Sequence, residues 1–367
     1  MRYRLNNKTK NAIKSIVFST TQSNFLVQSV AFKVRYGNVN KKLFKKSLSP
    51  NILNNYREKW QHLGYPVETK TLLLSYNLSG IVDLNIVPEN IFAAVIEPSI
   101  NYYKDKQLSL LSTKNFYEKW FDNAKVFPKS YLHKIDDIFY DSKLNRIDDI
   151  GLYLVNFKFE YPLICKPSLG TAGGEGVKTI KSLDELIDSL ESYKHLVIQE
   201  KIRQSSYLSS INPDINSIRT CLYRDLSGNF NVLNNSIRFG INGSLDNETA
   251  GGIVCNIQDE GQLNEYAVSK YCDIYFNHPN TGIEFSDVKI PNYEELISIS
   301  VELANQIPLA NIVSLDMCLD ENNKWRCIEV NLDNQTIRFS QYAGKGFFGD
   351  FTDEVIQRVL NNKASSI

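Results

Sequence analysis

Two stretches in the last sixth of the chain decide the fold: Ile312-Val-Ser-Leu-Asp-Met-Cys-Leu319 and Lys324-Trp-Arg-Cys-Ile-Glu-Val330. Both are rich in apolar residues and have the length of a strand. The polar run Asp320-Glu-Asn-Asn323 between them is typical of a turn. The sequence therefore predicts two paired, neighbouring strands.

Each predicted strand carries one acid, Asp316 in the first and Glu329 in the second, and Asn331 follows two residues later. Residues i and i+2 of a strand face the same side, so Glu329 and Asn331 can converge with Asp316 on one hard cation. Oxygen ligands suit Mg²⁺, which completes its shell with water and nucleotide phosphates. The alternative is a set of ordinary exposed acids, which the apolar neighbours disfavour because unpaired acids among apolar residues are costly.

A glycine-rich segment stands between an expected strand and an expected helix. The strand is Tyr161-Pro-Leu-Ile-Cys-Lys166, the segment is Gly170-Thr-Ala-Gly-Gly-Glu-Gly176, and the helix covers 183–190 with Ser182 as its cap. Backbone N–H groups of such a loop can approach phosphate oxygens, and a lysine at the strand end adds positive charge. The segment fits neither the Walker A nor the GxGxxG pattern, so taken alone it is equally consistent with a flexible hairpin.

The remaining patterns predict further elements and an organisation in three parts. The further elements are a helix over 114–123 capped by Ser112, a strand over 195–200, hairpins within 218–257, and a helix over 293–307 that ends before Pro308. The parts are an N-terminal basic region over 1–110 without a motif, a central subdomain over 111–202, and a C-terminal subdomain with the metal site over 203–367.

The composition is that of a soluble globular protein: 43% of the 367 residues are hydrophobic and 22% are charged. Six cysteines lack CxxC or Cys/His spacing and stand mostly in apolar runs, so we expect buried thiols in a reducing cytoplasm. No signal peptide or membrane span is expected, because polar residues interrupt the apolar stretch 12–32.

The zero net charge is divided unevenly along the chain. Residues 1–60 carry thirteen Lys and Arg against the single acid Glu58, a net +12, and the remainder carries 28 against 40, a net −12. Two interpretations stay open: a solvated basic face, or a contact with an anionic membrane or glycan, which Lys41-Lys42-Leu43-Phe44-Lys45-Lys46 suggests. Nucleic acid is disfavoured as a partner, because few aromatic residues interleave the basic run and no binding module follows it.

The order of these motifs resembles that of ATP-grasp enzymes such as D-alanine–D-alanine ligase. More narrowly, other motifs look like those of the sugar-transfer-associated ATP-grasp family of bacterial polysaccharide clusters. They are Ser-Ile-Arg219-Thr, Ile-Arg238-Phe-Gly, Asp246-Asn-Glu-Thr-Ala-Gly-Gly252, His278-Pro-Asn-Thr-Gly282 and Ile290-Pro291. The resemblance covers about two-thirds of the chain, from 112 to 349. It implies an α+β fold in which two α/β subdomains clasp ATP, with an additional N-terminal region of uncertain fold.

The resemblance also implies roles for individual residues. The ATP phosphates would be held by Lys114 and Lys166 and by a lid over the β- and γ-phosphates formed by Gly170, Thr171, Ala172, Gly173, Gly174 and Gly176. The hinge that holds adenine would be formed by Gln199, Glu200, Lys201 and Ile202. Mg²⁺ would be held by Asp316, Glu329 and Asn331.

The chain departs from related sequences at two positions. Thr113 stands where related chains tend to have an aspartate before the first lysine, and Ser314 stands where D-alanine–D-alanine ligases have an arginine. Positive charge near the transferred phosphoryl group must then come from elsewhere. Arg219 and Arg238 are our candidates for this role, and together with Lys166 they form the predicted catalytic set.

The implied reaction is that of an ATP-dependent carboxylate–amine ligase. The carboxylate of a sugar acid or an amino acid would attack the γ-phosphate, and an amine would then displace phosphate from the acyl phosphate to leave an amide. We expect this reaction in the cytoplasm, in the synthesis of a bacterial surface polysaccharide such as capsule or O-antigen. Two alternatives stay open: a kinase acting on a sugar or glycan hydroxyl, and a nucleotide-binding regulator of a glycan assembly complex.

Overall fold

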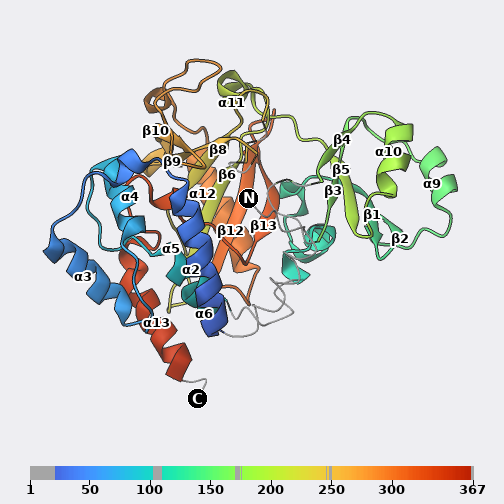
Figure 1. The fold of residues 1–367 in the computed structure, drawn as a ribbon. Helices are drawn as coiled ribbons and strands as arrows, with labels where there is room; N and C mark the ends of the chain where they lie inside the picture. The colour runs from blue at the N-terminus through green and yellow to red at the C-terminus, as the bar shows by residue number, and fades with distance from the viewer. Residues whose placement is uncertain are drawn as a thin grey trace, which may run out of the picture.

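The structure, a computed structural model, describes residues 21–101, 110–169, 174, 176–244, 246–247 and 250–364. The described chain forms a small lobe and a large lobe, each built on an antiparallel sheet (Figure 1). The small lobe projects from one side of the large lobe, and the helices of the N-terminal region lie on the large lobe.

The small lobe has a five-stranded sheet in the order β2-β1-β5-β3-β4. Its strands are β1 (Ser130–Ile135), β2 (Ile138–Asp141), β3 (Leu163–Pro167), β4 (Lys178–Ile180) and β5 (Leu196–Glu200). Two helices, α9 (Ile150–Asn156) and α10 (Leu183–Leu190), pack against it. Ser182 caps α10 as predicted, because its Oγ accepts a hydrogen bond from the Glu185 N–H at 3.2 Å, and Leu186 and Leu190 bury the inner face of the helix.

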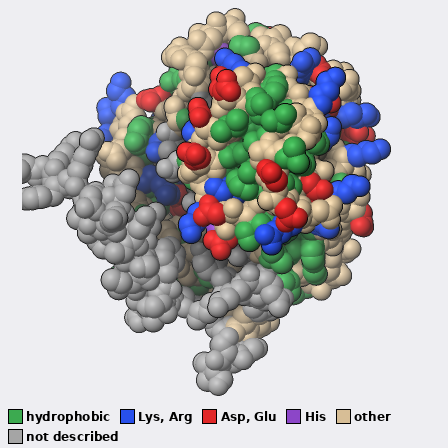
Figure 2. All heavy atoms as spheres, turned by 90° about the vertical axis from the view of Figure 1, so that its right-hand side faces the viewer, with side chains coloured by type: hydrophobic (Ala, Val, Ile, Leu, Met, Phe, Trp, Pro, Cys, Tyr) green, Lys and Arg blue, Asp and Glu red, His purple; other side chains and the backbone are tan. Residues whose placement is uncertain are grey.

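The outer face of the small lobe is partly apolar. Figure 2, which looks onto this lobe, shows hydrophobic side chains gathered near the centre of the face among charged ones. The exposed large apolar side chains of α9 and α10 are Leu152, Val155 and Ile187.

The large lobe has an eight-stranded sheet in the order β11-β10-β9-β8-β6-β12-β13, with β7 also paired to β6. Its strands are β6 (Ile218–Arg224), β7 (Phe230–Val232), β8 (Ser236–Phe239), β9 (Ile253–Ile257), β10 (Leu263–Ser269), β11 (Ile274–Tyr275), β12 (Ile312–Leu319) and β13 (Trp325–Asn331). The helix α11 (Ser206–Ile211) precedes these strands in the chain, and α12 (Tyr293–Asn305) lies between β11 and β12. The paired strands β12 and β13 are those that the sequence predicted.

The two faces of this sheet differ in chemistry. Alternate residues of β12, including Val313 and Leu315, enter a core that they share with Leu296 of α12. The residues between them, such as Ser314 and Asp316, therefore face the opposite side, because successive strand residues alternate. That opposite side is covered by the N-terminal helices and by the segment that follows β13.

The N-terminal region is helical and shares its core with the C-terminal part of the chain. Its elements are α2 (Thr21–Gly37), α3 (Pro50–Gln61), α4 (Lys70–Ser79), α5 (Glu89–Ile91), the π-helical turn η2 (Phe92–Ile96), and α6 (Glu97–Ile100). Phe92 packs edge-on against Phe347 with ring centroids 5.5 Å apart, and Val355 and Val359 of α13 (Thr352–Ala364) enter the same core. Among the described residues, no helix is long and apolar enough to cross a membrane.

One predicted helix is wrong in extent. In place of a helix over 114–123, the chain forms a 3₁₀ turn, Lys114–Phe116, and one α-helical turn, Tyr117–Trp120. Contacts with the end of α12 interrupt the helix, because Gln306 accepts from the Trp120 indole N–H at 2.7 Å and from the Asp122 backbone N–H at 2.8 Å. Ser112 is not the cap either; its carbonyl accepts a hydrogen bond from the Tyr117 hydroxyl. The prediction of six free, buried cysteines is confirmed.

Candidate active site

A row of polar side chains crosses the large sheet. In the register of the strands, Glu329 stands opposite Asp316, and Asp316 stands opposite Arg219. Arg219 in turn stands opposite Ser236, and Ser236 stands opposite Asn256. Directly paired residues of antiparallel strands point to the same face, so these five side chains from β13, β12, β6, β8 and β9 lie side by side. This row, from Glu329 to Asn256, is called the polar row below.

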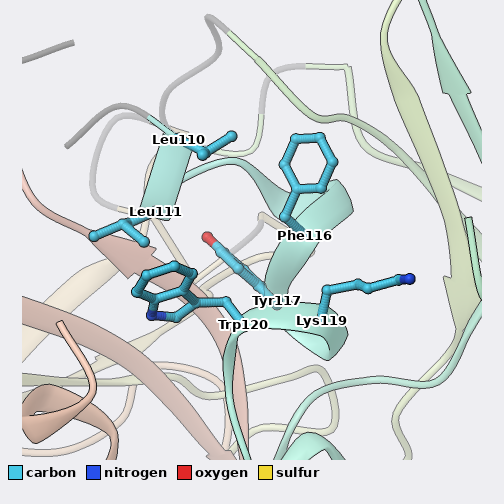
Figure 3. A pocket seen from close by; sticks show the side chains of 6 residues that line it. All are labelled: Leu110, Leu111, Phe116, Tyr117, Lys119 and Trp120. Carbon is cyan, nitrogen blue, oxygen red and sulfur yellow. The ribbon is translucent and has the colours of Figure 1, made fainter. Parts of the chain in front are cut away.

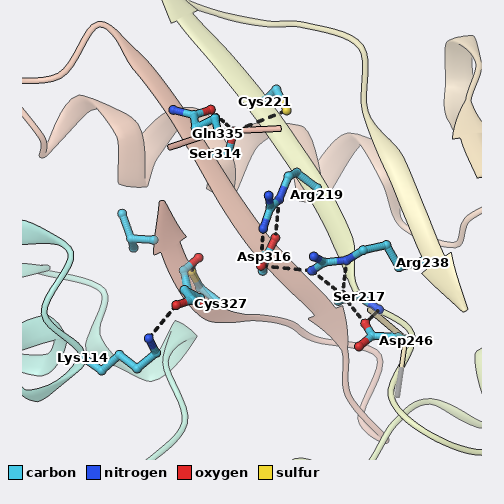
Figure 4. Close-up of polar contacts among 12 residues, drawn as sticks. Lys114, Ser217, Arg219, Cys221, Arg238, Asp246, Ser314, Asp316, Cys327 and Gln335 are labelled. Atoms are coloured by element: carbon cyan, nitrogen blue, oxygen red, sulfur yellow. Dashed lines mark hydrogen bonds and ion pairs between the residues drawn. The ribbon is translucent and has the colours of Figure 1, made fainter. Parts of the chain in front are cut away.

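Asp316 lies between two guanidinium groups (Figure 4). Arg219 donates to both carboxylate oxygens, from Nε and from NH2, at 2.8 Å each, and Arg238 NH2 lies 3.0 Å from Oδ2. Burial by itself would raise the pKa of Asp316, but the two positive charges hold this pKa well below its usual range. The carboxyl group is therefore ionised at neutral pH and can serve as a hard oxygen ligand.

Arg238 is held in place by the motif that begins at Asp246. It donates to the Ser217 hydroxyl from Nε at 3.0 Å and from NH2 at 2.7 Å. Asp246 in turn accepts from both the Ser217 hydroxyl and its backbone N–H. Gly252 closes the motif, because a Cβ there would stand 2.6 Å from the Asp246 carbonyl oxygen and 2.8 Å from that of Phe239. Asp246, acting through Ser217, thus positions the Arg238 guanidinium group beside Asp316.

Two lysines of the small-lobe side reach the other end of the polar row. Lys114 Nζ lies 2.5 Å from Glu329 Oε1, and Lys166 Nζ donates to the Ile328 carbonyl oxygen at 3.3 Å. Lys166 is 6% exposed, and this burial, together with the nearby Lys114 charge, lowers the pKa of Lys166 to about 8 against the pull of Glu329. The protein therefore compensates the Lys166 charge poorly, and an added anion would stabilise it.

The charges of the site sum to a positive value. Among the charged groups described above, two arginines and two lysines stand against three carboxylates, Asp316, Glu329 and Asp246, which gives a net charge of +1. This positive charge favours an anion such as a triphosphate, and a divalent cation would offset the remaining negative charge of that anion. The arrangement is suited to a nucleotide bound together with one metal ion.

The predicted metal ligands fit a magnesium ion. Asp316 and Glu329 occupy directly paired positions, and Asn331 lies two residues further along β13, opposite Ser314. The Asn331 Nδ2 atom is buried and has no hydrogen-bond partner. Two carboxylates and an amide supply hard oxygen donors, which suit Mg²⁺. Elsewhere in the described part of the chain, no cluster of three or more His, Cys, Asp or Glu side chains offers a metal site.

The predicted adenine hinge lies where the lobes join. Glu200 Oε1 accepts from the Lys129 backbone N–H at 2.9 Å and pairs with Arg326 of β13. Gln199 donates from Nε2 to the Pro128 carbonyl and the Ser130 hydroxyl, whereas its Oε1 is buried without a partner. Of the next two residues, Lys201 is exposed and Ile202 is half-buried.

The predicted lid is described only in part. Gly170, Thr171, Ala172 and Gly173 lie outside the described residues. Gly174 and Gly176 have positive φ angles of 76° and 79°, which glycine adopts at little cost. At Gly176 a Cβ would also stand 2.5 Å from the Tyr193 hydroxyl and 2.9 Å from Pro167 Cγ, so this position requires glycine.

Some residues of the site were not predicted from the sequence. Arg326 joins the hinge to β13 through Glu200 and the Phe127 carbonyl, and it also pairs with Asp320 at 3.3 Å. Ser236 and Asn256 complete the polar row. Only the pairing of the strands brings these side chains to the site, and no local motif marks them.

A hollow near the junction of the lobes contains none of the predicted site residues (Figure 3). Its lining is mostly apolar and consists of Leu110, Leu111, Phe116, Tyr117, Lys119 and Trp120. Residues 102–109 directly before it lie outside the described part of the chain.

Comparisons with solved structures give distant likenesses. The chain is similar to the D-Ala:D-Ser ligase VanG of Enterococcus faecalis, at 12% identity and a TM-score of 0.43 over 69% of this chain and 62% of that one. It is also similar to the biotin carboxylase domain of 2-oxoglutarate carboxylase from Hydrogenobacter thermophilus, at 17% identity and a TM-score of 0.39, over 68% of this chain and 46% of that one. The chain therefore spans between about half and three-fifths of the length of these structures. No curated protein matches its sequence.

Comparison with protein families confirms the resemblance noted in the sequence. The match covers residues 177–354, just under half of the chain, and includes both arginines and all three predicted metal ligands. The two antiparallel sheets with helices, one in each lobe, agree with the α+β ATP-grasp fold that this family implies. The family whose model residues 177–354 match is the sugar-transfer associated ATP-grasp family.

Proposed function

We propose that this chain is an Mg²⁺- and ATP-dependent ligase that joins a carboxylate to an amine and releases ADP and phosphate. The observation that carries the proposal is the charge pattern at the meeting of the lobes. A buried lysine whose charge the protein compensates poorly, Lys166, lies beside the paired carboxylates Asp316 and Glu329. A triphosphate with its metal ion would satisfy all three groups.

The small-lobe residues bind and orient ATP in this proposal. Lys166 contacts the phosphates, and Lys114 exchanges its contact with Glu329 for a contact with phosphate. The segment 170–176 closes over the β- and γ-phosphates, and backbone groups of 199–202 hold adenine. Exclusion of water by this closure protects the activated acceptor from hydrolysis.

Asp316, Glu329 and Asn331 would hold Mg²⁺. The ion would supply charge neutralisation and orientation of the phosphate oxygens. Release of Glu329 from Lys114 frees a carboxylate for this role at the moment when phosphate takes the lysine.

Arg219 and Arg238 stabilise the charge that develops on the transferred phosphoryl group. The acceptor carboxylate oxygen forms a bond to the γ-phosphorus while the bond to the β,γ-bridging oxygen breaks, which gives an acyl phosphate and ADP. The amine nitrogen then attacks the acyl carbon, phosphate leaves, and the amine loses a proton. Fixed guanidinium groups are effective here because they need not reorient during the reaction.

The test is release of ADP by the purified chain with Mg-ATP, sugar acids and amines, with and without hydroxylamine. A ligase forms a hydroxamate when hydroxylamine replaces the amine. A kinase gives ADP and a phosphorylated hydroxyl without hydroxamate, and a regulator gives no acceptor-dependent ADP. Glu329→Gln should lower turnover by about 10² to 10³, whereas Glu265→Gln, an exposed acid of β10 in the same sheet, should not.

A role in bacterial surface polysaccharide synthesis in the cytoplasm is part of the proposal, and the description of the family supports it. We also propose that the N-terminal region contacts an anionic membrane or glycan. The +12 charge of residues 1–60 supports this contact. So does an exposed apolar stripe on α2, where Leu26, Val30 and Val34 are 65%, 62% and 63% exposed at a four-residue spacing.

A further inference from the structure

Asn331 differs from the other two predicted metal ligands in how its side chain is held. Asp316 is held by two arginines, and Glu329 is held by Lys114. The Asn331 Nδ2 atom, by contrast, is buried and has no hydrogen-bond partner among the described residues. Asn331 is also the last residue of β13, which lies at the edge of the large sheet. The direction of its amide therefore depends on how the backbone on either side of it is fixed.

The backbone directly before this residue is held by Tyr117. The Val330 N–H donates to the Tyr117 hydroxyl at 3.1 Å, and this hydroxyl donates to the Ser112 carbonyl at 3.0 Å. Tyr117 is buried, and its ring packs against the rings of Phe121 and Phe127. The hydroxyl is thus a firmly held acceptor at the strand edge, where a further strand would otherwise supply one.

The backbone directly after Asn331 is held by Asn101, a fully buried residue that follows α6. Its Nδ2 donates to the Leu332 carbonyl at 2.8 Å and to the Ile312 carbonyl at 2.7 Å. Its Oδ1 accepts from the Ile312 N–H at 2.7 Å and from the Asn311 N–H at 2.9 Å. The amide therefore uses all four of its hydrogen-bonding positions to join the start of β12 to the residue that follows β13.

Two more contacts fix the chain beyond Leu332. Ser314, which stands directly opposite Asn331 in the strand register, donates from Oγ to Gln335 Oε1 at 2.5 Å (Figure 4). The Gln335 N–H donates to Glu97 Oε1 of α6 at 3.0 Å. The segment that follows Asn331 is therefore tied both to β12 and to the N-terminal region.

We propose that Asn101 and Tyr117 are positioning residues, which aim the Asn331 amide oxygen at the metal ion. This inference rests on the proposed function above. Neither residue is a metal ligand; both act by fixing the backbone on the two sides of Asn331. Loss of the groups that orient a metal ligand typically lowers metal affinity by about tenfold or more. Both residues precede the range 177–354, so the part of the chain that matches the family does not supply this support by itself.

A purely structural role would have a different signature. Removal of the Asn101 amide leaves four buried backbone groups without this partner, and removal of the Tyr117 hydroxyl leaves the Val330 N–H without one. Both changes therefore lower stability under either interpretation. Only a positioning role also lowers the metal affinity of the protein that remains folded.

The test is a titration with Mn²⁺, which suits the same oxygen ligands as Mg²⁺ and is detected by electron paramagnetic resonance. The chain is in excess over a non-hydrolysable ATP analogue, and Tm is measured for each variant. Tyr117→Phe and Asn101→Ala should each weaken Mn²⁺ binding by about tenfold. Asn331→Ala provides the reference for loss of the ligand itself.

Each variant has a matched control in the same lobe. Tyr266→Phe removes a buried tyrosine hydroxyl of β10 that donates to the Tyr342 carbonyl at 2.7 Å. Gln341→Ala removes a buried amide whose Oε1 accepts from the Val87 N–H at 2.7 Å and from the Phe347 N–H at 3.0 Å. Both controls should lower Tm and leave the Mn²⁺ affinity unchanged.

The outcomes separate this positioning role from the reaction. Unchanged Mn²⁺ affinity in Tyr117→Phe and Asn101→Ala would overturn the positioning role and leave the proposed metal and nucleotide sites standing. An equal loss of affinity in the two controls would show that the variants act through general stability, and would overturn it as well. Absence of Mn²⁺ binding by the wild type with the analogue would refute the proposed function together with this inference. If Asn101→Ala does not fold, Tyr117→Phe, which removes a single oxygen atom, decides alone.

Discussion

Replacement of Lys166 by methionine should stabilise the nucleotide-free protein while removing its response to ATP. Methionine has a similar length and needs no hydration. The pKa of Lys166 is lowered from 10.5 to about 8, chiefly by burial. At about 1.4 kcal/mol per pKa unit, the charged lysine costs the folded state about 3 kcal/mol. Loss of its hydrogen bond to the Ile328 carbonyl costs the variant about 1 kcal/mol. The variant should therefore gain about 2 kcal/mol, which for a chain of 367 residues is roughly 3 °C in Tm.

The pH dependence of this gain follows from the direction of the shift. Below pH 8 the folded protein holds Lys166 charged and bears the whole cost. As the pH rises from 8 toward the unfolded value of 10.5, the folded lysine loses its proton first, so the wild type regains stability. The advantage of the variant should therefore be constant below pH 8 and shrink above it.

The assay is thermal unfolding in phosphate-free buffer at pH 7 and pH 9, with and without Mg²⁺ and a non-hydrolysable ATP analogue. The matched control is Lys134→Met. Lys134 is 7% exposed but donates to the Leu190 carbonyl at 2.7 Å and pairs with Asp137 at 2.9 Å, so its loss should lower Tm. A lower Tm for the Lys166 variant without nucleotide, or an unchanged rise in Tm with the analogue, would refute the assignment of Lys166 to the phosphates.

Three further predictions concern other parts of the chain. Burial raises the pKa of Glu97 from 4.5 to about 8, so the wild type should lose stability as the pH rises from 4.5 through 8. In thermal unfolding, Glu97→Gln should therefore have a higher Tm than the wild type at pH 9 and the same Tm at pH 5. Replacement of the four exposed lysines Lys41, Lys42, Lys45 and Lys46 by glutamine should weaken sedimentation with vesicles that contain anionic phospholipid and leave ATP affinity within a factor of two; undiminished, salt-insensitive sedimentation would mean that this basic run is only a solvated face. Gly176→Val, which forces a β-branched side chain to positive φ, should raise the KM for ATP and increase hydrolysis without transfer; amide exchange across 168–176 that does not slow with Mg-ATP would argue against closure of this segment.

Where hydrophobic pattern and turn residues agree, the sequence was sufficient to predict structure. The strand over 312–319 has the predicted bounds, because its apolar run ends at a polar turn that no tertiary contact overrides. The helix over 114–123 failed for the opposite reason. Its aromatic spacing is that of a helix, but the helical turn ends at Trp120. Hydrogen bonds from Trp120 and Asp122 to Gln306 hold the following residues in a non-helical conformation.

The polar row shows which part of the site could not be predicted. Asp316 and Glu329 are marked by the hairpin they share, whereas Ser236 and Asn256 come next to Arg219 only through the register of three more strands. The core of residues 21–101 was equally hidden, because its apolar side chains pack on residues that follow some 250 positions later, as Phe92 does on Phe347. Neither kind of contact leaves a local pattern in the sequence.

The attachment of the small lobe divides the site into two parts of different origin. The chain enters and leaves this lobe beside the same β12–β13 hairpin: the Val330 N–H donates to the Tyr117 hydroxyl at 3.1 Å on the way in, and the Ser205 N–H donates to the Leu319 carbonyl at 2.9 Å on the way out. In chain topology the small lobe is thus an insertion in the large one. Because it is attached at two points on the same hairpin, the motion with least resistance is a rotation about the line that joins these two points. Such a rotation would separate Lys166 from β13 without disturbing the polar row beyond Asp316. Exchange of the segment 113–204 between relatives should then transfer the handling of the nucleotide and leave the choice of acceptor with the recipient.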